Sequence, residues 1–246
     1  MTKGILVHEG RNTHFSYTIP EGEGPFPVVL FSHGYNGCMT DFDQIREKLK
    51  KQNIASCALT FSGGSTRDES GYPSTCMTLE TEKNDLLSLI GWAIKRDEID
   101  KERMFLFGAS MGGLVSCLAA KEAAEKIRAI VLLFPALCIV DDWNNRFRDE
   151  SEIPEEMMFW NLLLGKKFFT SMREMNVYEI LSELTIKTLI FHGDKDPIVP
   201  VGYSEKAAKT MKNAALSVFG GEGHGFTSEA NEKMDEMTIA FVKENL

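Results

Sequence analysis

The sequence predicts an α/β protein in which helices cover both faces of a mostly parallel sheet. Short apolar runs alternate along the chain with longer segments of helical periodicity. From the second run onward, the apolar runs are nearly continuous, which is typical of parallel strands buried on both faces. The length of 246 residues and the hydrophobic share of 43% fit one large domain, or one domain with an insertion.

The expected strands are runs rich in aliphatic, β-branched and aromatic residues. The segment PEGEGPFP separates the first two and reads as a turn because of its glycines and prolines. In chain order, the predicted strands are 13–19 (THFSYTI), 28–33 (VVLFSH), 54–61 (IASCALTF), 104–108 (MFLFG), 129–134 (AIVLLF), 187–193 (KTLIFHG) and 215–220 (ALSVFG).

The segments between these strands are predicted helices, at 40–52, 78–96, 112–125, 203–212 and 229–245. The second helix has an apolar face of period 3.6 that would lie on the sheet, made of Leu79, Leu86, Leu87, Leu89, Ile90, Ala93 and Ile94. Strand–helix alternation predicts right-handed crossovers. Ligands of such open sheets bind outside the carboxyl ends of the strands, so we expect the functional site at that edge.

One segment interrupts the alternation, because residues 136–185 are far longer than a usual α/β connection. The segment holds a charged stretch (DDWNNRFRDESE), an apolar stretch (MMFWNLLLG) and a further FF pair. We interpret it as a small helical cap. The sheet domain would then comprise residues 1–135 and 186–246.

Charge and composition exclude several classes of partner. The net charge of -9 disfavours nucleic acid and anionic membrane surfaces, which bind clustered Lys and Arg. The N-terminal residues lack the apolar core of a signal peptide, and no run is long enough to span a bilayer. The five cysteines are widely spaced and contain no C-x-x-C pair, so neither a disulfide framework nor a zinc motif is predicted. We therefore expect a cytoplasmic protein.

The segment FLFGASMGGLVS (105–116) contains the nucleophile-elbow pattern G-x-S-x-G around Ser110. In this pattern a strand turns sharply into a helix and presents the serine hydroxyl at the turn. A serine needs a neighbouring base to become a nucleophile. The plainer interpretation is that Ser110 is a small residue that caps the helix.

Candidates for the base and its orienting acid follow in the order Ser, Asp, His that this elbow requires. The segment HGDKDPIVP (192–200) holds Asp194 and Asp196, and SVFGGEGHGF (217–226) holds His224. Both segments follow predicted strands, so all candidates would meet at one edge of the sheet. For His224 the plain alternative is a surface-loop histidine.

The segment HGYNG (33–37) ends another strand and supplies a candidate oxyanion hole. In hydrolases with this elbow, the hole combines the amide after the nucleophile with one from an early strand–helix loop. Here these are the amides of Met111 and Tyr35. His33 and His192 end strands without any zinc-ligand spacing, so we expect no metal, and we expect Cys38 to be a bystander.

Together, HGYNG, GASMGG, the G-x-x-D of HGDKDPIVP, and GHGF resemble the α/β-hydrolases. The resemblance is to small bacterial carboxylesterases, including feruloyl and cinnamoyl esterases, and runs from about residue 26 to the end of the chain. It implies the α/β-hydrolase fold with a cap after the sixth strand, no cofactor, and a triad of Ser110, His224 and Asp196. Asp194 remains the competitor for the acid.

The resemblance further implies a serine carboxylesterase that hydrolyses small or aryl esters through an acyl-enzyme. Feruloyl-type relatives hold a phenolic hydroxyl with a carboxylate and a tyrosine from the cap. Asp141 or Asp142 would supply the carboxylate, whereas Phe168 stands at the tyrosine position, which favours plainer esters over hydroxycinnamoyl ones. Trp160 is a further candidate for the pocket.

Other functions remain open, because the same fold serves monoacylglycerol lipases, thioesterases, serine peptidases and non-catalytic binding proteins. The expected partner is a small-molecule ester. Proteins of this fold often form homodimers, but no segment of the sequence identifies an interface.

Overall fold

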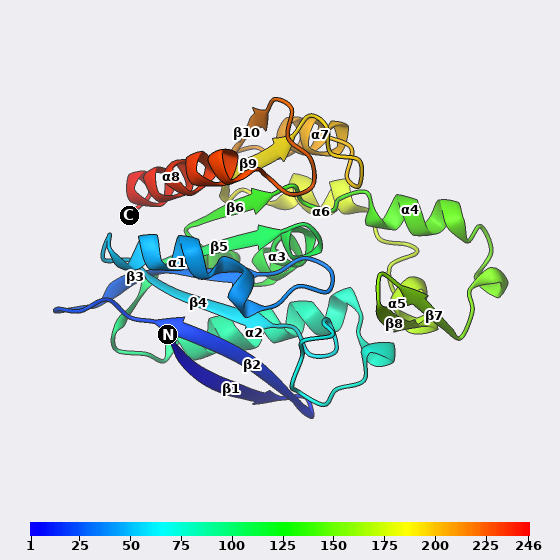
Figure 1. Ribbon diagram of the computed structural model, residues 1–246, viewed down its shortest axis with the longest axis horizontal. Helices are drawn as coiled ribbons and strands as arrows, with labels where there is room; N and C mark the ends of the chain where they lie inside the picture. Colours follow the sequence, from blue (N-terminus) through cyan, green and yellow to red (C-terminus); the bar gives the residue numbers. More distant parts are fainter.

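The computed structural model describes residues 1–246 and contains a central eight-stranded sheet (Figure 1). The strand order is β1-β2-β4-β3-β5-β6-β9-β10. The strands are β1 (Thr2–His8), β2 (Arg11–Thr18), β3 (Phe26–Ser32), β4 (Ala55–Thr60), β5 (Ile99–Ala109), β6 (Ala129–Leu133), β9 (Lys187–Gly193) and β10 (Ala214–Phe219). The β1–β2 hairpin joins β4 in antiparallel orientation, and all other neighbours are parallel. Every predicted strand is present, and β1 is an additional one.

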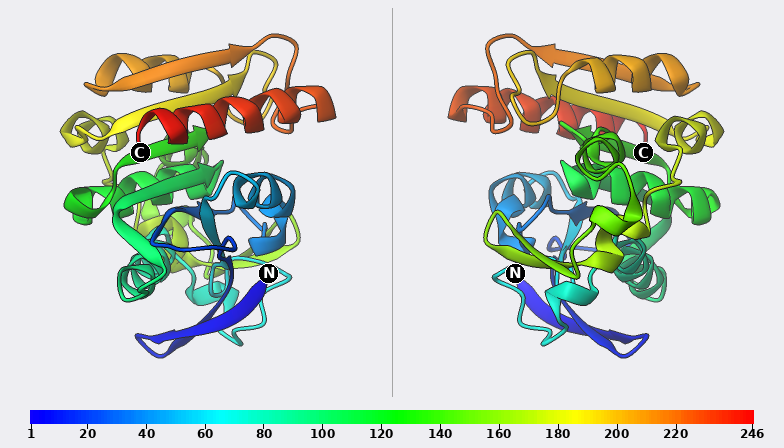
Figure 2. Two further views of the ribbon diagram at one scale, coloured as in Figure 1. Left: turned by 90° about the vertical axis from the view of Figure 1, so that its left-hand side faces the viewer. Right: turned by 90° about the vertical axis from the view of Figure 1, so that its right-hand side faces the viewer.

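Helices cover both faces of this sheet, as the two side views in Figure 2 show. The five predicted helices are α1 (Asp43–Lys50), α2 (Leu79–Ile94), α3 (Met111–Glu122), α7 (Gly202–Thr210) and α8 (Ser228–Glu244). Short 3-10 turns at Met39–Phe42 and Ala124–Lys126 account for the remainder of two predicted ranges. None of the helices combines the length and the apolar character that a membrane span requires.

Strand β3 shows why both faces of the sheet are apolar. Val28 and Leu30 belong to the larger core cluster, which includes residues of α2, α3 and α7. Val29 and Phe31 point the other way, into a smaller cluster with residues of α1 and α8. Successive strand residues face opposite sides, so a strand buried between two helical layers needs an unbroken apolar run.

The insertion between β6 and β9 contains a hairpin as well as helices, which the prediction of a small helical cap did not include. Its elements are α4 (Ile139–Arg146), a 3-10 turn (Glu150–Glu152), β7 (Glu156–Phe159), β8 (Leu162–Gly165), α5 (Lys166–Thr170) and α6 (Val177–Glu183). The run MMFWNLLLG folds as β7, a turn at Trp160 and Asn161, and β8. Both turn residues have positive φ (41° and 63°), as a two-residue type I′ hairpin turn requires.

Helix α6 is different from the rest of the insertion. It packs against α3 and α7, and Val177 and Leu181 are part of the larger core cluster. Part of the predicted cap is thus the crossover helix that returns the chain from β6 to β9. In Figure 1, α4, α5 and the β7–β8 hairpin lie to the right of the sheet, beyond this helix.

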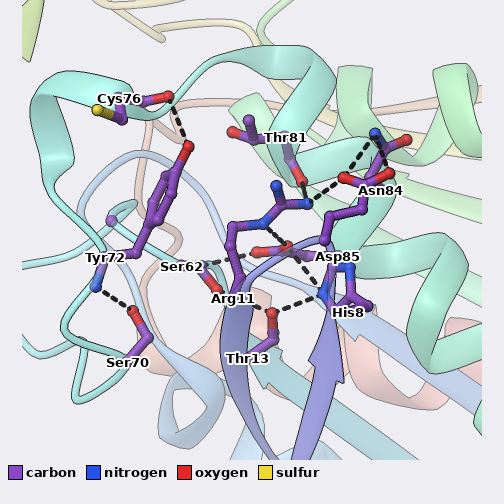
Figure 3. A network of polar contacts seen from close by, with 12 residues as sticks. His8, Arg11, Thr13, Ser62, Ser70, Tyr72, Cys76, Thr81, Asn84 and Asp85 are labelled. Atoms are coloured by element: carbon purple, nitrogen blue, oxygen red, sulfur yellow. Dashed lines mark hydrogen bonds and ion pairs between the residues drawn. The ribbon is translucent and has the colours of Figure 1, made fainter.

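The N-terminal hairpin is attached to α2 by a buried polar network (Figure 3). Arg11 Nε donates to Asp85 Oδ1 at 2.9 Å, and the backbone N–H of Ser62 donates to Asp85 Oδ2 at 2.8 Å. His8 Nε2 lies 3.2 Å from the same carboxylate. The Arg11 side chain is 5% exposed and that of Asp85 is fully buried, so this ion pair joins β2 to α2 inside the protein.

Candidate active site

Ser110 lies at a sharp turn between β5, which ends at Ala109, and α3, which begins at Met111. Its backbone has φ 51° and ψ -121°, a conformation that L-residues adopt only under strain. Three hydrogen bonds of 2.9 Å hold this backbone: Ser110 N donates to Leu133 O, and the amides of Gly113 and Ala136 donate to Ser110 O. The Ser110 side chain makes no capping bond to α3, which argues against the plain capping interpretation.

The elbow brings backbones so close together that only glycine fits. A Cβ on Gly108 would lie 2.4 Å from Gly112 O, and a Cβ on Gly112 would lie 2.3 Å from the carbonyl oxygens of Ser32 and His33. Helix α3 therefore begins directly against the end of β3. The glycines around Ser110 are explained by this close approach.

His224 and Asp196 form a hydrogen-bonded relay with Ser110. His224 Nε2 lies 2.9 Å from Ser110 Oγ, and His224 Nδ1 lies 2.8 Å from Asp196 Oδ2. The carboxylate can only accept, so Nδ1 carries the proton and the Nε2 lone pair faces the serine hydroxyl. The loops after β5, β9 and β10 supply the three residues at one edge of the sheet.

The loop after β9 gives its two aspartates different partners. Asp196 Oδ1 accepts the backbone N–H groups of Ile198 and Val199, both at 2.8 Å, which fixes the carboxylate toward His224. Asp194 Oδ1 instead accepts the amide of Gly221 at 2.6 Å. The geometry therefore places Asp196, and not Asp194, next to the imidazole.

A second histidine, His192, lies next to the Asp196 carboxylate. Its Nε2 donates to Val199 O at 2.8 Å and lies 3.3 Å from Asp196 Oδ2, while Nδ1 lies 2.7 Å from Ser204 Oγ. Burial lowers the pKa of His192. A neutral, buried ring with all its polar atoms paired is a structural group of the surrounding loops.

The HGYNG loop (residues 33–37) passes close to Ser110, because a Cβ on Gly34 would lie 2.9 Å from Ser110 Cβ. The Tyr35 N–H donates to no protein acceptor. The Met111 N–H belongs to the first turn of α3, where amides have no intrahelical partner. Both amides are therefore available to bind an anionic oxygen near Ser110.

His33 fixes the orientation of this loop. The ring is buried, which lowers its pKa to about 4 and keeps it neutral. Its Nε2 accepts the Phe61 N–H at 3.0 Å, so Nδ1 is the atom that donates to Gly34 O, at 2.6 Å. The Gly34 carbonyl and the Tyr35 N–H share one peptide plane and point in opposite directions. The hydrogen bond from His33 thus determines where the Tyr35 amide points.

Phe134 is a site residue that sequence analysis did not identify. Its ring centroid lies 4.5 Å from that of His224, and its backbone has a positive φ of 35° just after β6. A bulky residue in this conformation is strained. No sequence signal marks it, because the residue looks like the end of an apolar strand.

A cavity of about 250 Å³ opens at Ser110 between the sheet edge and the cap. Eleven of its fourteen lining residues are hydrophobic. The lining residues are Tyr35, Ser110, Met111, Ala136, Cys138, Ile139, Asp142, Trp143, Arg146, Phe159, Trp160, Phe168, Ile198 and Val199. Among the predicted pocket residues, Asp142, Trp160 and Phe168 are present.

Asp141 was also predicted to line the pocket, and this prediction is wrong. Its Oδ2 accepts a hydrogen bond from Tyr203 Oη at 2.9 Å, and it does not line the cavity. Consecutive residues of α4 point in directions about 100° apart, and the cavity side of the helix is taken by Ile139, Asp142, Trp143 and Arg146, which leaves Asp141 directed toward Tyr203. No group of three or more His, Cys, Asp or Glu side chains is arranged to hold a metal ion.

A serine at a strand–helix elbow, at the carboxyl edge of a mainly parallel sheet with this strand order, defines an α/β-hydrolase. The chain belongs to the prolyl oligopeptidase family, whose sequence model matches residues 42–246. The predicted fold class is therefore confirmed.

Several distant relatives match over most of the chain. The AB hydrolase superfamily protein YisY of Bacillus subtilis is 22% identical over 87% of this chain and 90% of its own length. Est1E from Butyrivibrio proteoclasticus, solved with bound ferulic acid, has a TM-score of 0.89 at 23% identity, covering 98% of each chain. A monoacylglycerol lipase from Paleococcus ferrophilus has a TM-score of 0.72 at 15% identity, covering 95% of this chain and 99% of its own. At these identities the structural likenesses describe the fold.

Proposed function

We propose that the protein is a serine hydrolase that cleaves carboxylic esters of small or aryl acyl groups. The observation that carries the proposal is the relay of Ser110, His224 and Asp196 at the mouth of an apolar cavity. Most of the cavity wall is apolar, so alkyl and aryl acyl groups would bury against Trp143, Phe159 and Phe168.

The reaction follows from the positions of these groups. Ser110 Oγ attacks the ester carbonyl while His224 Nε2 takes its proton. The oxygen that becomes negative is stabilised by the Tyr35 and Met111 amides. His224 then protonates the departing alcohol, and water activated by the same imidazole releases the acid. Asp196 holds the imidazole tautomer and stabilises its charged form.

One substrate class receives separate support. The Asp142 carboxylate lies on the cavity wall and can accept a hydrogen bond from a phenolic hydroxyl, and Est1E binds ferulic acid within the same fold. Phe168 offers no second polar partner there. We therefore include hydroxycinnamoyl esters among the test substrates and expect plainer aryl and short-chain esters to be hydrolysed at least as well.

Three variants test the assignment. Ser110→Ala should reduce hydrolysis of p-nitrophenyl butyrate to the uncatalysed rate while the circular dichroism spectrum stays that of the folded protein. Asp196→Asn should lower kcat by up to about 10⁴, because the imidazole loses its correct tautomer. Asp194→Asn is the matched control and should change kcat by less than about tenfold, because Asp194 bonds only to a loop amide. Turnover retained by Ser110→Ala would remove that residue from its role.

A peptidase is the second candidate, because the matching family is named for prolyl oligopeptidase. Blocked prolyl p-nitroanilides compared with p-nitrophenyl esters distinguish the two activities. Labelling of Ser110 by a fluorophosphonate probe distinguishes either enzyme from a non-catalytic binding protein, in which the serine would not react.

A further inference from the structure

The HGYNG loop is bonded directly to the tip of the cap hairpin. Tyr35 Oη donates to Phe159 O at 2.8 Å, and Asn36 Nδ2 donates to Trp160 O at 3.1 Å. The Tyr35 ring also packs edge-on against the rings of Phe159 and Trp160, with centroids 5.4 and 6.1 Å away. Two consecutive residues of the HGYNG loop thus hold two consecutive residues of the cap.

The loop is the fixed partner in this contact. Asn36 Oδ1 accepts the backbone N–H and the hydroxyl of Thr66, at 2.8 and 3.0 Å, and Gly37 N donates to Gly34 O at 3.0 Å. The buried His33 ring also donates a hydrogen bond to Gly34 O. The loop is therefore anchored to the sheet domain without any help from the cap.

The hairpin tip is the dependent partner. Strands β7 and β8 form a separate two-stranded sheet that does not join the central one. An isolated two-stranded hairpin is only marginally stable. Away from its tip, the hairpin is held by Ser74 Oγ, which donates to Leu163 O at 2.7 Å, and by Leu162 and Leu164, which are buried in the larger core cluster. At the tip, the ring of Trp143 packs against Phe159. Without the bonds from Tyr35 and Asn36, the turn at Trp160 would lose its polar anchors.

We infer that Tyr35 is a specificity-determining residue, whose phenol fixes the Phe159–Trp160 wall of the cavity so that large acyl groups bind productively at Ser110. This inference rests on the proposed esterase function. Both wall residues line the cavity. A benzoyl group would rest on the wall, whereas an acetyl group would leave most of the cavity unfilled. Burial raises the pKa of Tyr35 well above its ordinary value, so the phenol remains a donor at every pH at which the protein would be assayed.

The kinetic test uses two esters with one leaving group, p-nitrophenyl benzoate and p-nitrophenyl acetate. Tyr35→Phe keeps the ring and the backbone amide and removes only the hydroxyl. The ratio of kcat/KM for benzoate to that for acetate should fall about 3- to 10-fold, mainly through a higher KM for benzoate, as expected for one lost neutral hydrogen bond. Asn36→Asp keeps the acceptor for Thr66 but loses the donor to Trp160, and should shift the ratio in the same direction.

Tyr178→Phe is the matched control, because Tyr178 Oη also donates to a backbone carbonyl, Tyr203 O at 3.1 Å, but lies outside the cavity. It should keep the wild-type ratio. An unchanged ratio in both Tyr35→Phe and Asn36→Asp would overturn the inference.

Hydrogen–deuterium exchange provides a readout that requires no catalysis. In Tyr35→Phe, amides of residues 156–165 should exchange about 2- to 10-fold faster, while peptides of the central sheet exchange as in the wild type. Unchanged exchange in the hairpin would show that the Tyr35 hydroxyl does not stabilise the hairpin tip. If the wild type hydrolyses no ester but the variant still exchanges faster in the hairpin, the proposed function is rejected, while the stabilising contact between Tyr35 and the hairpin tip is retained.

Discussion

Glu82 is a buried carboxyl group that the proposed reaction does not use. It lies on α2 with both oxygens unbonded, and Oε1 would be 2.7 Å from a Cβ on Gly64. Burial, together with the nearby charge of Asp85, raises its pKa well above the ordinary value. Glu82 therefore keeps its proton to a higher pH in the folded protein than in the unfolded chain.

This state makes stability depend on pH. Above about pH 4.3, the ordinary pKa of Glu, the unfolded chain releases the proton that the folded protein retains. The free energy of unfolding then falls as pH rises toward the raised pKa, by up to about 1.4 kcal/mol per pH unit. Glu82→Gln should remove this loss, so its gain over the wild type should be larger at pH 7.5 than at pH 4.5. Urea unfolding at both pH values measures it, with the exposed Glu125→Gln as control. Equal gains at both pH values would contradict this account.

At the same scale, sequence reasoning identified residues better than it identified their orientations. The elbow pattern and the Ser–Asp–His order predicted Ser110 and His224 and limited the acid to Asp194 or Asp196, because both depend only on chain order and residue type. The preference for Asp196 came from the G-x-x-D pattern of the resembling family. The sequence left the choice between Asp141 and Asp142 open, since it depends on the rotation of α4 about its own axis. Phe134 was missed because its residue type is the one expected at the end of an apolar strand, so the sequence does not reveal its strained backbone.

At the scale of elements, the elbow between β5 and α3 depends on a close approach of α3 to the end of β3 at Gly112. A Cβ at Gly112 would overlap the carbonyl oxygens of Ser32 and His33, so Gly112→Ala must push α3 away from the HGYNG loop. We expect a loss of about 1–3 kcal/mol in the free energy of unfolding. Ester hydrolysis should fall as well, because Ser110 and the Met111 amide move with the helix.

Gly91→Ala is the control within a helix, because a Cβ at Gly91 in α2 meets no atom within 4 Å. It should raise stability by about 0.5–1 kcal/mol, the usual gain from replacing a helical glycine with alanine, and should leave activity unchanged. Thermal unfolding and p-nitrophenyl butyrate hydrolysis check both variants. A fully active and stable Gly112→Ala protein would show that the close approach is not required.

Elements of the sheet domain were predictable because periodicity reports how a segment is buried. The cap hairpin was not, since an apolar run such as MMFWNLLLG fits a strand pair or a buried helix equally well. Its turn residues, Trp160 and Asn161, also differ from the Asn-Gly and Asp-Gly pairs that usually mark a type I′ turn. Strand β1 was missed because only Leu6 of its short apolar run is buried, whereas Ile5 and Val7 face solvent, so the run does not alternate as a half-buried strand would.

At the scale of the whole molecule, the ion pair of Arg11 and Asp85 holds the N-terminal hairpin on the sheet domain. Arg11→Met would leave Asp85 buried without its cation, so we expect a loss of about 3–5 kcal/mol in the free energy of unfolding. Lys121→Met removes an exposed ion pair with Glu183 and should cost less than about 1 kcal/mol. Chemical denaturation of the two variants measures the difference, and equal losses would show that burial of the pair has no effect.

Topology explains how far the site could be predicted from sequence. Parallel strands bring their carboxyl ends to one edge, so residues 114 positions apart meet there whatever their spacing in the chain. The cavity could not be predicted in the same way, because its wall depends on how the cap folds and where its tip rests.

The contact between the HGYNG loop and the cap also bears on how such proteins diversify. On the cap side its hydrogen bonds use only the backbone oxygens of residues 159 and 160. Any pair of amino acids that maintains the same turn presents those atoms, so mutations at these two positions can reshape the chamber and still leave the two hydrogen bonds in place. Evolution, or a laboratory library randomised at the two codons, can thereby explore new substrate preferences without disturbing the reaction machinery below.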